Sequence, residues 1–284
     1  MANAGRNAAA ERGRRRRWGA ARDALWDFVT PLIEDGARVA IVGAGNGDDL
    51  PLRRIARRAG SATLIDLDPL AARRARRRLG RAERAKVDVI GHDVTEGDAD
   101  RIVLTAPAAS DSADRPRLAA EPDRRGRPLP GPAPSLPTSA PSLPGAPYDL
   151  VIGDLFYSQL LYPALVDLEV DPDRRAEVLM RHAPALTRVV VARLHASAPR
   201  VVHVHDPIAW WEGHEQPVTL EEILLAAREG GPGSGLALAA RGVGPIESDP
   251  RAALADLGLT PTDAALWRWP FSPGVDYLAC ATLA

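Results

Sequence analysis

The sequence predicts an α/β fold with a doubly wound, mainly parallel sheet, and three observations lead to this expectation. Apolar segments of strand length alternate with helical patterns, which implies crossover connections between parallel strands. The first of these segments, VAIV at 39–42, has no polar alternation, as expected of a strand covered by helices on both faces. A glycine loop follows it directly. A chain of 284 residues with 45% hydrophobic content can bury the core of one such domain.

The N-terminal half divides into a tail and regular alternation. Residues 1–17 are rich in charge and short of large apolar groups, which predicts a disordered basic tail before a single domain over 18–284. The apolar stripe from Trp18 to Ile33 predicts a helix that packs beside the first strand. The expected elements are then strand 38–43, helix 49–59, strand 61–66, helix 69–79, strand 86–91 and strand 148–153.

An insertion over 106–147 separates the last two of these strands and ends in PLPGPAPSLPTSAPSLPGAP. Proline at this density prevents helix and sheet, so we expect a flexible, disordered surface loop. The remaining pattern predicts helices 159–167, 173–186 and 221–228, an apolar stretch 189–194, a strand 201–205 and a loop 230–235. Residues 266–269 and 275–283 are expected to pair antiparallel at the edge of the sheet.

Composition excludes several classes of protein. The 36 basic and 37 acidic residues nearly cancel, which argues against a dedicated nucleic-acid binder, and arginine runs such as 73–78 are interpreted as solvated helix faces. The single cysteine, Cys280, excludes an internal disulfide and a Cys zinc cluster. No apolar run reaches the roughly 20 residues of a membrane span, and no signal-peptide core follows the first arginines. We therefore expect a cytoplasmic protein without a membrane partner.

The glycine loop and the acids that end the strands form one constellation. Glycines at 43, 45 and 47 permit backbone angles and close approaches that a Cβ would forbid. Asp66, about 20 residues beyond the loop, can accept hydrogen bonds from both ribose hydroxyls of a nucleoside. Asp93 is expected to accept from an adenine amino group while Val94 packs against the ring, and Asp154 ends the fourth strand. The alternatives are a loop that only connects strand to helix, and aspartates that cap the helices after them.

The segments VGAGNGDDLP, IDLDP, GHDV and YDLVIGD are similar to the motifs of class I S-adenosylmethionine-dependent methyltransferases. The resemblance covers about 37–206 and extends to the C-terminal strand pair. It implies a Rossmann-like fold, S-adenosylmethionine (SAM) as the cofactor, and cofactor-binding residues Gly43, Gly45, Asn46, Gly47, Asp48, Asp66, Leu67, Asp93, Val94 and Asp154.

Two departures bear on the transferred group. Ile41 stands where the family often has an acid, and spermidine synthases, which share the fold, also tend to be apolar there. Their fourth-strand motif carries a further acid and a proline, whereas this chain reads DLFYS at 154–158. Methyl transfer is therefore favoured, with transfer of an aminopropyl or 3-amino-3-carboxypropyl group left open. Asp48 replaces the last glycine of a dinucleotide motif, and Asp48 and Asp49 suit a zwitterionic amino-acid tail better than a pyrophosphate.

The acceptor is expected beyond the fourth and fifth strands, where ligands bind in such sheets. Phe156, Tyr157, Ser158, Gln159 and Tyr162 are placed at the pocket rim, with Tyr157 as a catalytic candidate. His205 and Asp206 are predicted to remove the acceptor's proton. No metal is expected, although His205, His214, Asp206 and Glu215 could be imagined to chelate one.

We therefore expect a methyltransferase for a small-molecule acceptor, modified at nitrogen or oxygen. A nonenzymatic nucleoside-binding scaffold is the alternative from another class. The oligomeric state stays open, with a homodimer as one form.

Overall fold

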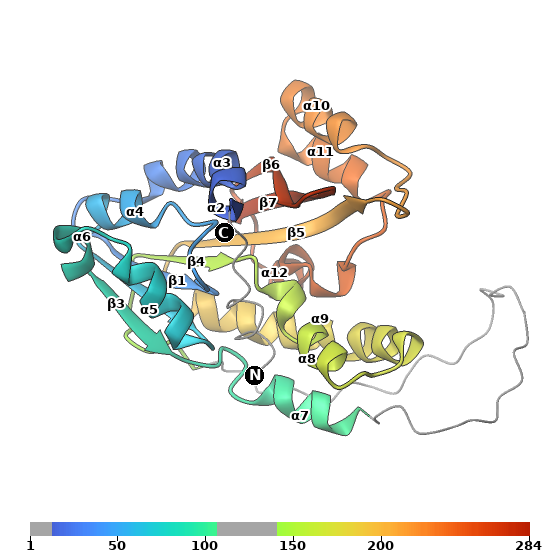
Figure 1. The fold of residues 1–284 in the computed structure, drawn as a ribbon, viewed down its shortest axis with the longest axis horizontal. Coiled ribbons are helices and arrows are strands. Elements are labelled where there is room, and N and C mark those ends of the chain that lie inside the picture. The colour runs from blue at the N-terminus through green and yellow to red at the C-terminus, as the bar shows by residue number, and fades with distance from the viewer. Residues whose placement is uncertain (1–12, 107–140) are drawn as a thin grey trace, which may run out of the picture.

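Seven strands form one sheet in the computed structural model, which describes residues 13–106 and 141–284. Their order is β3-β2-β1-β4-β5-β7-β6 (Figure 1), and the first five run parallel. Strand β7 pairs antiparallel with both β5 and β6. The predicted doubly wound, mainly parallel sheet with an antiparallel C-terminal pair is confirmed. The strands are β1 Arg38–Val42, β2 Ser61–Asp66, β3 Val87–Gly91, β4 Leu150–Asp154, β5 Val201–Trp211, β6 Asp263–Ser272 and β7 Val275–Leu283.

Helices cover both faces of the sheet (Figure 1). One hydrophobic cluster joins the sheet to α3, α4 and α5, and a second joins the opposite face to α9 and α12. Smaller clusters pack α7 and α8 on α9, and α10 and α11 on the end of β5. The α-helices are α2 Arg14–Arg17, α3 Gly19–Val29, α4 Leu52–Arg58, α5 Pro69–Arg77, α6 Arg81–Ala85, α7 Asp98–Thr105, α8 Tyr162–Asp167, α9 Pro172–His195, α10 Leu220–Gly230, α11 Pro232–Ala239 and α12 Pro250–Asp256, and short 3-10 turns lie at Thr30–Leu32, Tyr157–Gln159 and Ile246–Ser248.

Asp-Pro pairs begin three of the helices. The carboxylates of Asp68, Asp171 and Asp249 each accept a backbone N–H from the first turn of α5, α9 and α12. A proline follows each aspartate at the first helical position, where no N–H is needed and the fixed φ already suits a helix. The Asp-Pro pairs in the sequence therefore mark where these three helices begin.

Several expectations about element boundaries are wrong. The strand expected over 201–205 continues to Trp211, the helix expected over 159–167 begins at Tyr162, and the strand expected over 266–269 spans Asp263–Ser272. Helix α4 begins at Leu52 rather than at residue 49, because the loop continues to the N-cap Pro51. Residues 173–186 and 189–194 belong to one helix, α9, which runs through Pro184. The expected loop at 230–235 contains the start of α11, whose proline stands in the first turn, where it is tolerated.

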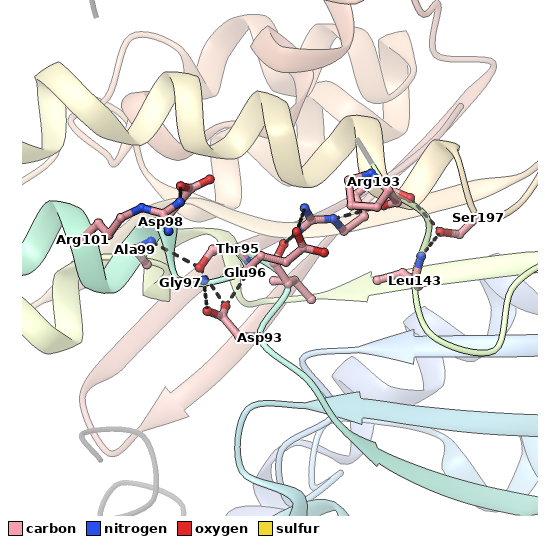
Figure 2. Close-up of polar contacts among 12 residues, drawn as sticks. Asp93, Thr95, Glu96, Gly97, Asp98, Ala99, Arg101, Leu143, Arg193 and Ser197 are labelled. Carbon is pink, nitrogen blue, oxygen red and sulfur yellow. Dashed lines mark hydrogen bonds and ion pairs between the residues drawn. The ribbon is translucent and has the colours of Figure 1, made fainter. Parts of the chain in front are cut away.

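The expected tail and insertion are shorter than predicted. Residues 13–17 are ordered, because the α2 arginines bind groups elsewhere in the fold, while 1–12 lie outside the described residues. Residues 141–147 are also fixed. Leu143 is buried and donates its N–H to the Ser197 hydroxyl at 2.7 Å, and the buried guanidinium of Arg193 donates to the Pro141 carbonyl at 3.2 Å (Figure 2). The rest of the insertion, 107–140, lies outside the described residues.

The strand order changes direction between β1 and β4. Strand β1 pairs with β2 on one side and with β4 on the other, so the chain winds away from β1 in both directions. In sheets of this kind, ligands bind at the carboxyl ends of the strands at this switch point. The glycine loop after β1 therefore occupies the place where a binding site is expected.

Candidate functional site

The glycine loop after β1 packs so closely on the end of β4 that no side chain fits at Gly43. Gly43 has φ of 79°, and a Cβ built there would lie 2.8 Å from the Asp154 carbonyl oxygen and 2.9 Å from the ring of Phe156. Gly45 and Gly47 also have positive φ, and the Gly47 N–H donates to the Ala44 carbonyl at 2.8 Å. The close approach thus requires glycine at 43, and the positive φ favours glycine at 45 and 47.

Asp66 ties the end of β2 to this loop. Its Oδ2 accepts the Gly45 N–H at 2.7 Å, and its Oδ1 accepts the Asp68 N–H at 2.7 Å. Burial raises the pKa of this carboxyl, and the two N–H donors oppose that effect. Each oxygen keeps a lone pair for a ligand. Leu67, the next residue, is 61% exposed and available to cover a planar ring.

Asp93 is occupied by its own loop. Oδ1 accepts from the Thr95 N–H at 2.8 Å and from the Thr95 hydroxyl at 2.7 Å, and Oδ2 accepts the Gly97 N–H at 2.7 Å (Figure 2). This arrangement matches the turn and capping alternative. Val94 is buried in the hydrophobic cluster beside α9, and its carbonyl accepts from Arg193. Contact of Val94 with adenine stays a prediction, since the side chain is 9% exposed and packs in this cluster.

Asp48 is held by arginines of this chain. It forms ion pairs with Arg14 at 2.6 Å and with Arg78 at 2.8 Å, and Arg22 donates to its carbonyl at 2.5 Å. Arg78 also donates to the carbonyl of Asn46, a buried residue. These arginines thus hold the glycine loop in place through Asp48 and Asn46. Arg78 departs from the expectation of a solvated helix face, and arginine abundance hid this role in the sequence.

Asp49 and Asp154, which we call the acid pair, meet in a small pocket on the other side of the loop. The pocket is lined by Ala21, Leu25, Asp49, Asp154, Leu155, Val204, Trp267 and Trp269 and has a free volume of about 10 Å³. That volume admits one water molecule or one ammonium group. Both carboxylate oxygens of the buried Asp154 lack a hydrogen-bond partner among the described residues.

The acid pair resists ionisation in this pocket. Burial raises the pKa of Asp49 to about 6. Burial raises the pKa of Asp154 well above its ordinary value, and the negative charge of Asp49 raises it further. Leu155, directly after Asp154, has φ of 50°, a left-handed conformation that a leucine adopts only under strain. Such strain is concentrated at functional sites. A cation would relieve the repulsion in this pocket.

The three catalytic candidates lie in different surroundings. Tyr157 is buried, stacks on Phe156 and shares a 2.6 Å hydrogen bond with His203 Nδ1. Its expected position at a pocket rim is wrong, because the 3-10 turn after β4 points the ring inward. His205 is also buried, 3.4 Å from Asp249, and burial lowers its pKa to about 4. Burial and the lowered pKa both argue against His205 as the base for an acceptor at the sheet edge.

Asp206 is the one of the three that lies at the carboxyl edge. Asp206 follows His205 in β5, so strand alternation places it on the opposite face from His203 and His205, and the pairing with β7 is irregular between His205 and Ile208. Ser158 Oγ donates to its Oδ1 at 3.1 Å. Burial raises the pKa of Asp206 to about 7, and the Ser158 hydroxyl opposes that effect. The half-buried Tyr277 of β7 is near enough for Asp206 to raise its pKa, after the larger effect of burial. Sequence reasoning missed Tyr277, because only the sheet pairing brings β7 beside β5.

The other residues expected at the pocket rim, and the residues considered as metal ligands, lie apart from one another in the fold. Tyr162 is 47% exposed and lies under the Arg175 guanidinium, while Gln159 donates to the Leu155 carbonyl. His214 stacks on Trp211 at the far end of β5. Over residues 13–106 and 141–284, no group of three or more His, Cys, Asp or Glu side chains is arranged to hold a metal. No helix in the same residues is long and apolar enough to cross a membrane.

Comparison with known proteins gives distant structural likenesses. No family model and no curated protein matches the chain. Magnesium protoporphyrin IX methyltransferase from Synechocystis PCC 6803, solved with bound S-adenosylhomocysteine (SAH), is 14% identical with a TM-score of 0.41, over 93% of this chain and 82% of that chain. A SAM-dependent methyltransferase from Aquifex aeolicus is 10% identical with a TM-score of 0.36, over 90% and 87%. A protein from Pyrococcus horikoshii, provisionally assigned as an RNA methyltransferase, is 12% identical with a TM-score of 0.43, over 93% and 81%.

The order of the sheet and its antiparallel end agree with the architecture that the motifs predicted. The chain has a class I methyltransferase fold. A fold of this kind can serve several reactions and acceptors, so function has to be argued from the site.

Proposed function

We propose that this protein is a methyltransferase that binds SAM across the glycine loop and modifies a small-molecule acceptor. One arrangement carries the proposal: Asp66 lies on the β2 side of the loop, and the acid pair lies on its β4 side. These positions suit the two polar ends of a nucleoside that carries an amino acid, a ribose diol at one end and an ammonium group at the other.

The β2 side suits a ribose and a purine. The Asp66 oxygens each accept one backbone N–H and retain lone pairs for the two hydroxyl groups. The missing Cβ at Gly45 would let a ligand approach the loop backbone, whereas the missing Cβ at Gly43 makes room for the end of β4. Leu67 offers an exposed apolar surface for the base. Asp93 keeps less capacity for the purine, because three donors of its own loop already bind it.

The β4 side suits an ammonium group. The free volume beside the acid pair matches a group of the size of water, and the unpartnered oxygens of Asp154 would accept its protons. An unpartnered carboxylate is costly to bury, so a cation that enters this pocket gains the interaction that the free protein lacks. The unpartnered oxygens of Asp154 support its predicted role in cofactor binding, and Asp49 joins it in the same pocket.

When bound, SAM supplies a methyl group on a positively charged sulfur. The residues of this chain then have to align the acceptor and remove its proton, and alignment accounts for much of the rate in such displacements. Asp206 lies two residues beyond Val204, the register partner of Asp154, at the same edge of the sheet. A carboxyl with a pKa of about 7 can take up a proton near neutral pH, and Ser158 holds its orientation.

One observation favours a second candidate, transfer of an aminopropyl group. Ile41 is fully buried within β1, so the position where the family often carries an acid lies in the core. The pocket of the acid pair contains no basic side chain among its lining residues. Decarboxylated SAM has the ammonium group without a carboxylate, and this acidic pocket would repel it less than SAM. Transfer of the 3-amino-3-carboxypropyl group uses SAM itself and stays an alternative.

A small molecule is the acceptor class that the site supports best. The proposed acceptor position is next to three polar groups, those of Asp206, Ser158 and Tyr277. These groups suit one hydroxyl or amine rather than a nucleic-acid backbone. The near-zero net charge of the chain points the same way.

Calorimetric titration tests the proposal. We expect SAM and SAH to bind the wild-type protein and to bind Asp66→Ala much more weakly. Failure of SAM, decarboxylated SAM and SAH to bind would overturn the proposal and leave a scaffold role. Product analysis then separates the transfer reactions, because methyl transfer releases SAH, whereas aminopropyl or carboxypropyl transfer releases methylthioadenosine.

A further inference from the structure

A second cavity lies behind the glycine loop, on the face of the sheet covered by α3, α4 and α5. It is an open cleft of about 440 Å³, and six arginines line it: Arg15, Arg22, Arg53, Arg54, Arg57 and Arg78. Buried Leu50 and Leu52 contribute to its apolar floor. Gly47 is its single contact with the glycines of the loop, and it shares no lining residue with the pocket of the acid pair.

Positive charge in this arginine cleft exceeds the negative charge around it. Asp23 is the one acid among the lining residues, and it pairs with Arg54 at 2.7 Å. Arg57 pairs with Glu83 at 2.9 Å and Arg78 with Asp48 at 2.8 Å. Arg15 and Arg53 form no ion pair within the part of the chain that the structure describes.

The close spacing of the arginines makes it harder for Arg22 to carry its positive charge. Its guanidinium donates to the Asp48 carbonyl, and burial together with the positive charge of Arg15 lowers its pKa. Arg15, Arg22 and Arg53 thus form no ion pair among the described residues, although Asp23, Asp49 and Asp48 act on Arg22 over a longer distance and Arg53 acts in the same way on Glu83. A ligand with about three negative charges would balance them, and two phosphate groups carry roughly that charge at neutral pH.

We propose that the arginine cleft binds a small molecule with two or more phosphate groups on an apolar body, of the nucleoside diphosphate or triphosphate class. Guanidinium groups bind phosphate oxygens in a bidentate manner, which lysine cannot do. The volume lies within the range of small-ligand pockets. The apolar floor gives a ring a surface to pack on, while the arginines on the walls reach the phosphates.

The ligand would touch arginines that also hold the glycine loop. Arg22 and Arg78 reach from the cleft to Asp48, and Arg78 also donates to the Asn46 carbonyl. Ligand binding in the cleft is therefore expected to change the affinity of the proposed SAM site. The binding itself does not depend on the proposed function, because the cleft touches the glycine loop only at Gly47 and shares no lining residue with the pocket of the acid pair.

The test is calorimetry with tripolyphosphate and with ATP as probes, without SAM, at low salt. The decisive variant is Arg15→Gln/Arg53→Gln, because both side chains are exposed and hold no other described residue by an ion pair. The matched control, Arg73→Gln/Arg77→Gln, removes the same charge from exposed positions of α5 that do not line the cleft. We expect the decisive variant to weaken ATP binding at least tenfold and the control to change it less than twofold.

Three results would overturn the proposal. The first is absence of ATP and tripolyphosphate binding to the wild-type protein. The second is equal weakening by both double variants, which would indicate attraction to general surface charge. The third is binding of a 20-nucleotide RNA or of phosphatidylserine vesicles that depends on Arg15 and Arg53 and outcompetes ATP, which would make the cleft part of a macromolecular or membrane interface. Unfolding temperatures of both variants close to that of the wild type verify that they are folded.

Discussion

The carboxylate of Asp66 accepts the backbone N–H of Gly45 at 2.7 Å, so the end of β2 fixes the shape of the loop that follows β1. Its other oxygen accepts the Asp68 N–H at the same distance, and Asp68 in turn caps α5. One side chain thereby joins strand, loop and helix at the switch point of the sheet. The proposed ribose-binding group and the conformation of the glycine loop therefore depend on the same residue.

Asp66→Ala should weaken SAM binding by about 10- to 100-fold, since charge-assisted hydrogen bonds contribute roughly 1.5–3 kcal/mol. Calorimetric titration measures this change. Asp88→Ala is the matched control, because Asp88 is an exposed acid on neighbouring β3. Equal affinity of the Asp66→Ala and wild-type proteins would contradict the placement of the ribose.

Asp154→Asn should stabilise the ligand-free protein at pH 8 while weakening its affinity for SAM. The folded-state pKa of Asp154 is raised, so the unfolded chain releases this proton at lower pH than the folded chain does. Stability therefore falls as pH rises above the ordinary value of 3.8 toward the raised value, and the variant escapes that loss. Thermal unfolding at pH 5 and pH 8 checks this, and the difference in unfolding temperature between the variant and the wild type should be larger at pH 8. A variant less stable than the wild type at pH 8 would indicate that the carboxylate has a structural partner.

Asp206→Asn should lower turnover by about 100- to 10,000-fold, the usual range for a general base. The wild-type rate should rise with pH up to about 7, because the carboxylate form of Asp206 accepts the proton. The Ser158 hydroxyl lowers that pKa, so Ser158→Ala should move the rising limb to higher pH. A pH–rate profile of the three proteins checks both effects, and an unshifted limb in Ser158→Ala would exclude Asp206 as the titrating group.

Asp48→Asn should destabilise the protein by about 2 kcal/mol, because it leaves Arg14 and Arg78 without their carboxylate partner. Asp98→Asn is the control, since its ion pair with the 70% exposed Arg101 should contribute less than about 1 kcal/mol. Urea unfolding of both variants gives the comparison. Similar small losses in both would mean that the arginines find other partners when Asp48 is changed.

His205→Gln should flatten the acid limb of stability. Burial lowers the folded-state pKa of His205 from 6.5 to about 4, so the unfolded chain binds a proton before the folded chain does. This group's contribution is present above pH 6.5 and is lost as pH falls toward 4. Urea unfolding at pH 7.5 and pH 5 should show a larger drop for the wild type than for the variant. If both proteins lose the same stability, His205 is protonated in the folded state.

Local patterns predicted most of the elements but failed where side chains from distant segments meet. The run of Val39 to Val42 describes a single element, and the structure contains it as the buried strand that was expected. The run at 230–235 looked like a loop because of its glycines, although packing on β6 supports a helix there. Proline at 184 suggested a break, but α9 continues because its apolar face packs on the sheet.

The candidate site shows the same division. Gly43, Gly45, Gly47 and Asp66 are recognisable from spacing alone, because each lies within one strand-loop-helix unit. Tyr157 and His205 have the chemistry of catalytic groups, yet the structure places both in the interior. Asp93 could bind a base or cap a turn, and its hydrogen bonds show that it caps its own loop.

The sequence by itself determined the fold class, the glycine loop and the acids at the strand ends, because these depend on backbone conformation and on the period of apolar residues. The tertiary structure alone decided which acids have partners. Asp48 lies beside Arg14 and Arg78, whereas Asp154 lies with Asp49 in an apolar pocket, and no spacing in the sequence distinguishes these surroundings. The charge state and ligand preference of a carboxylate depend on its burial and on its neighbours, and both are set by segments far apart in the chain.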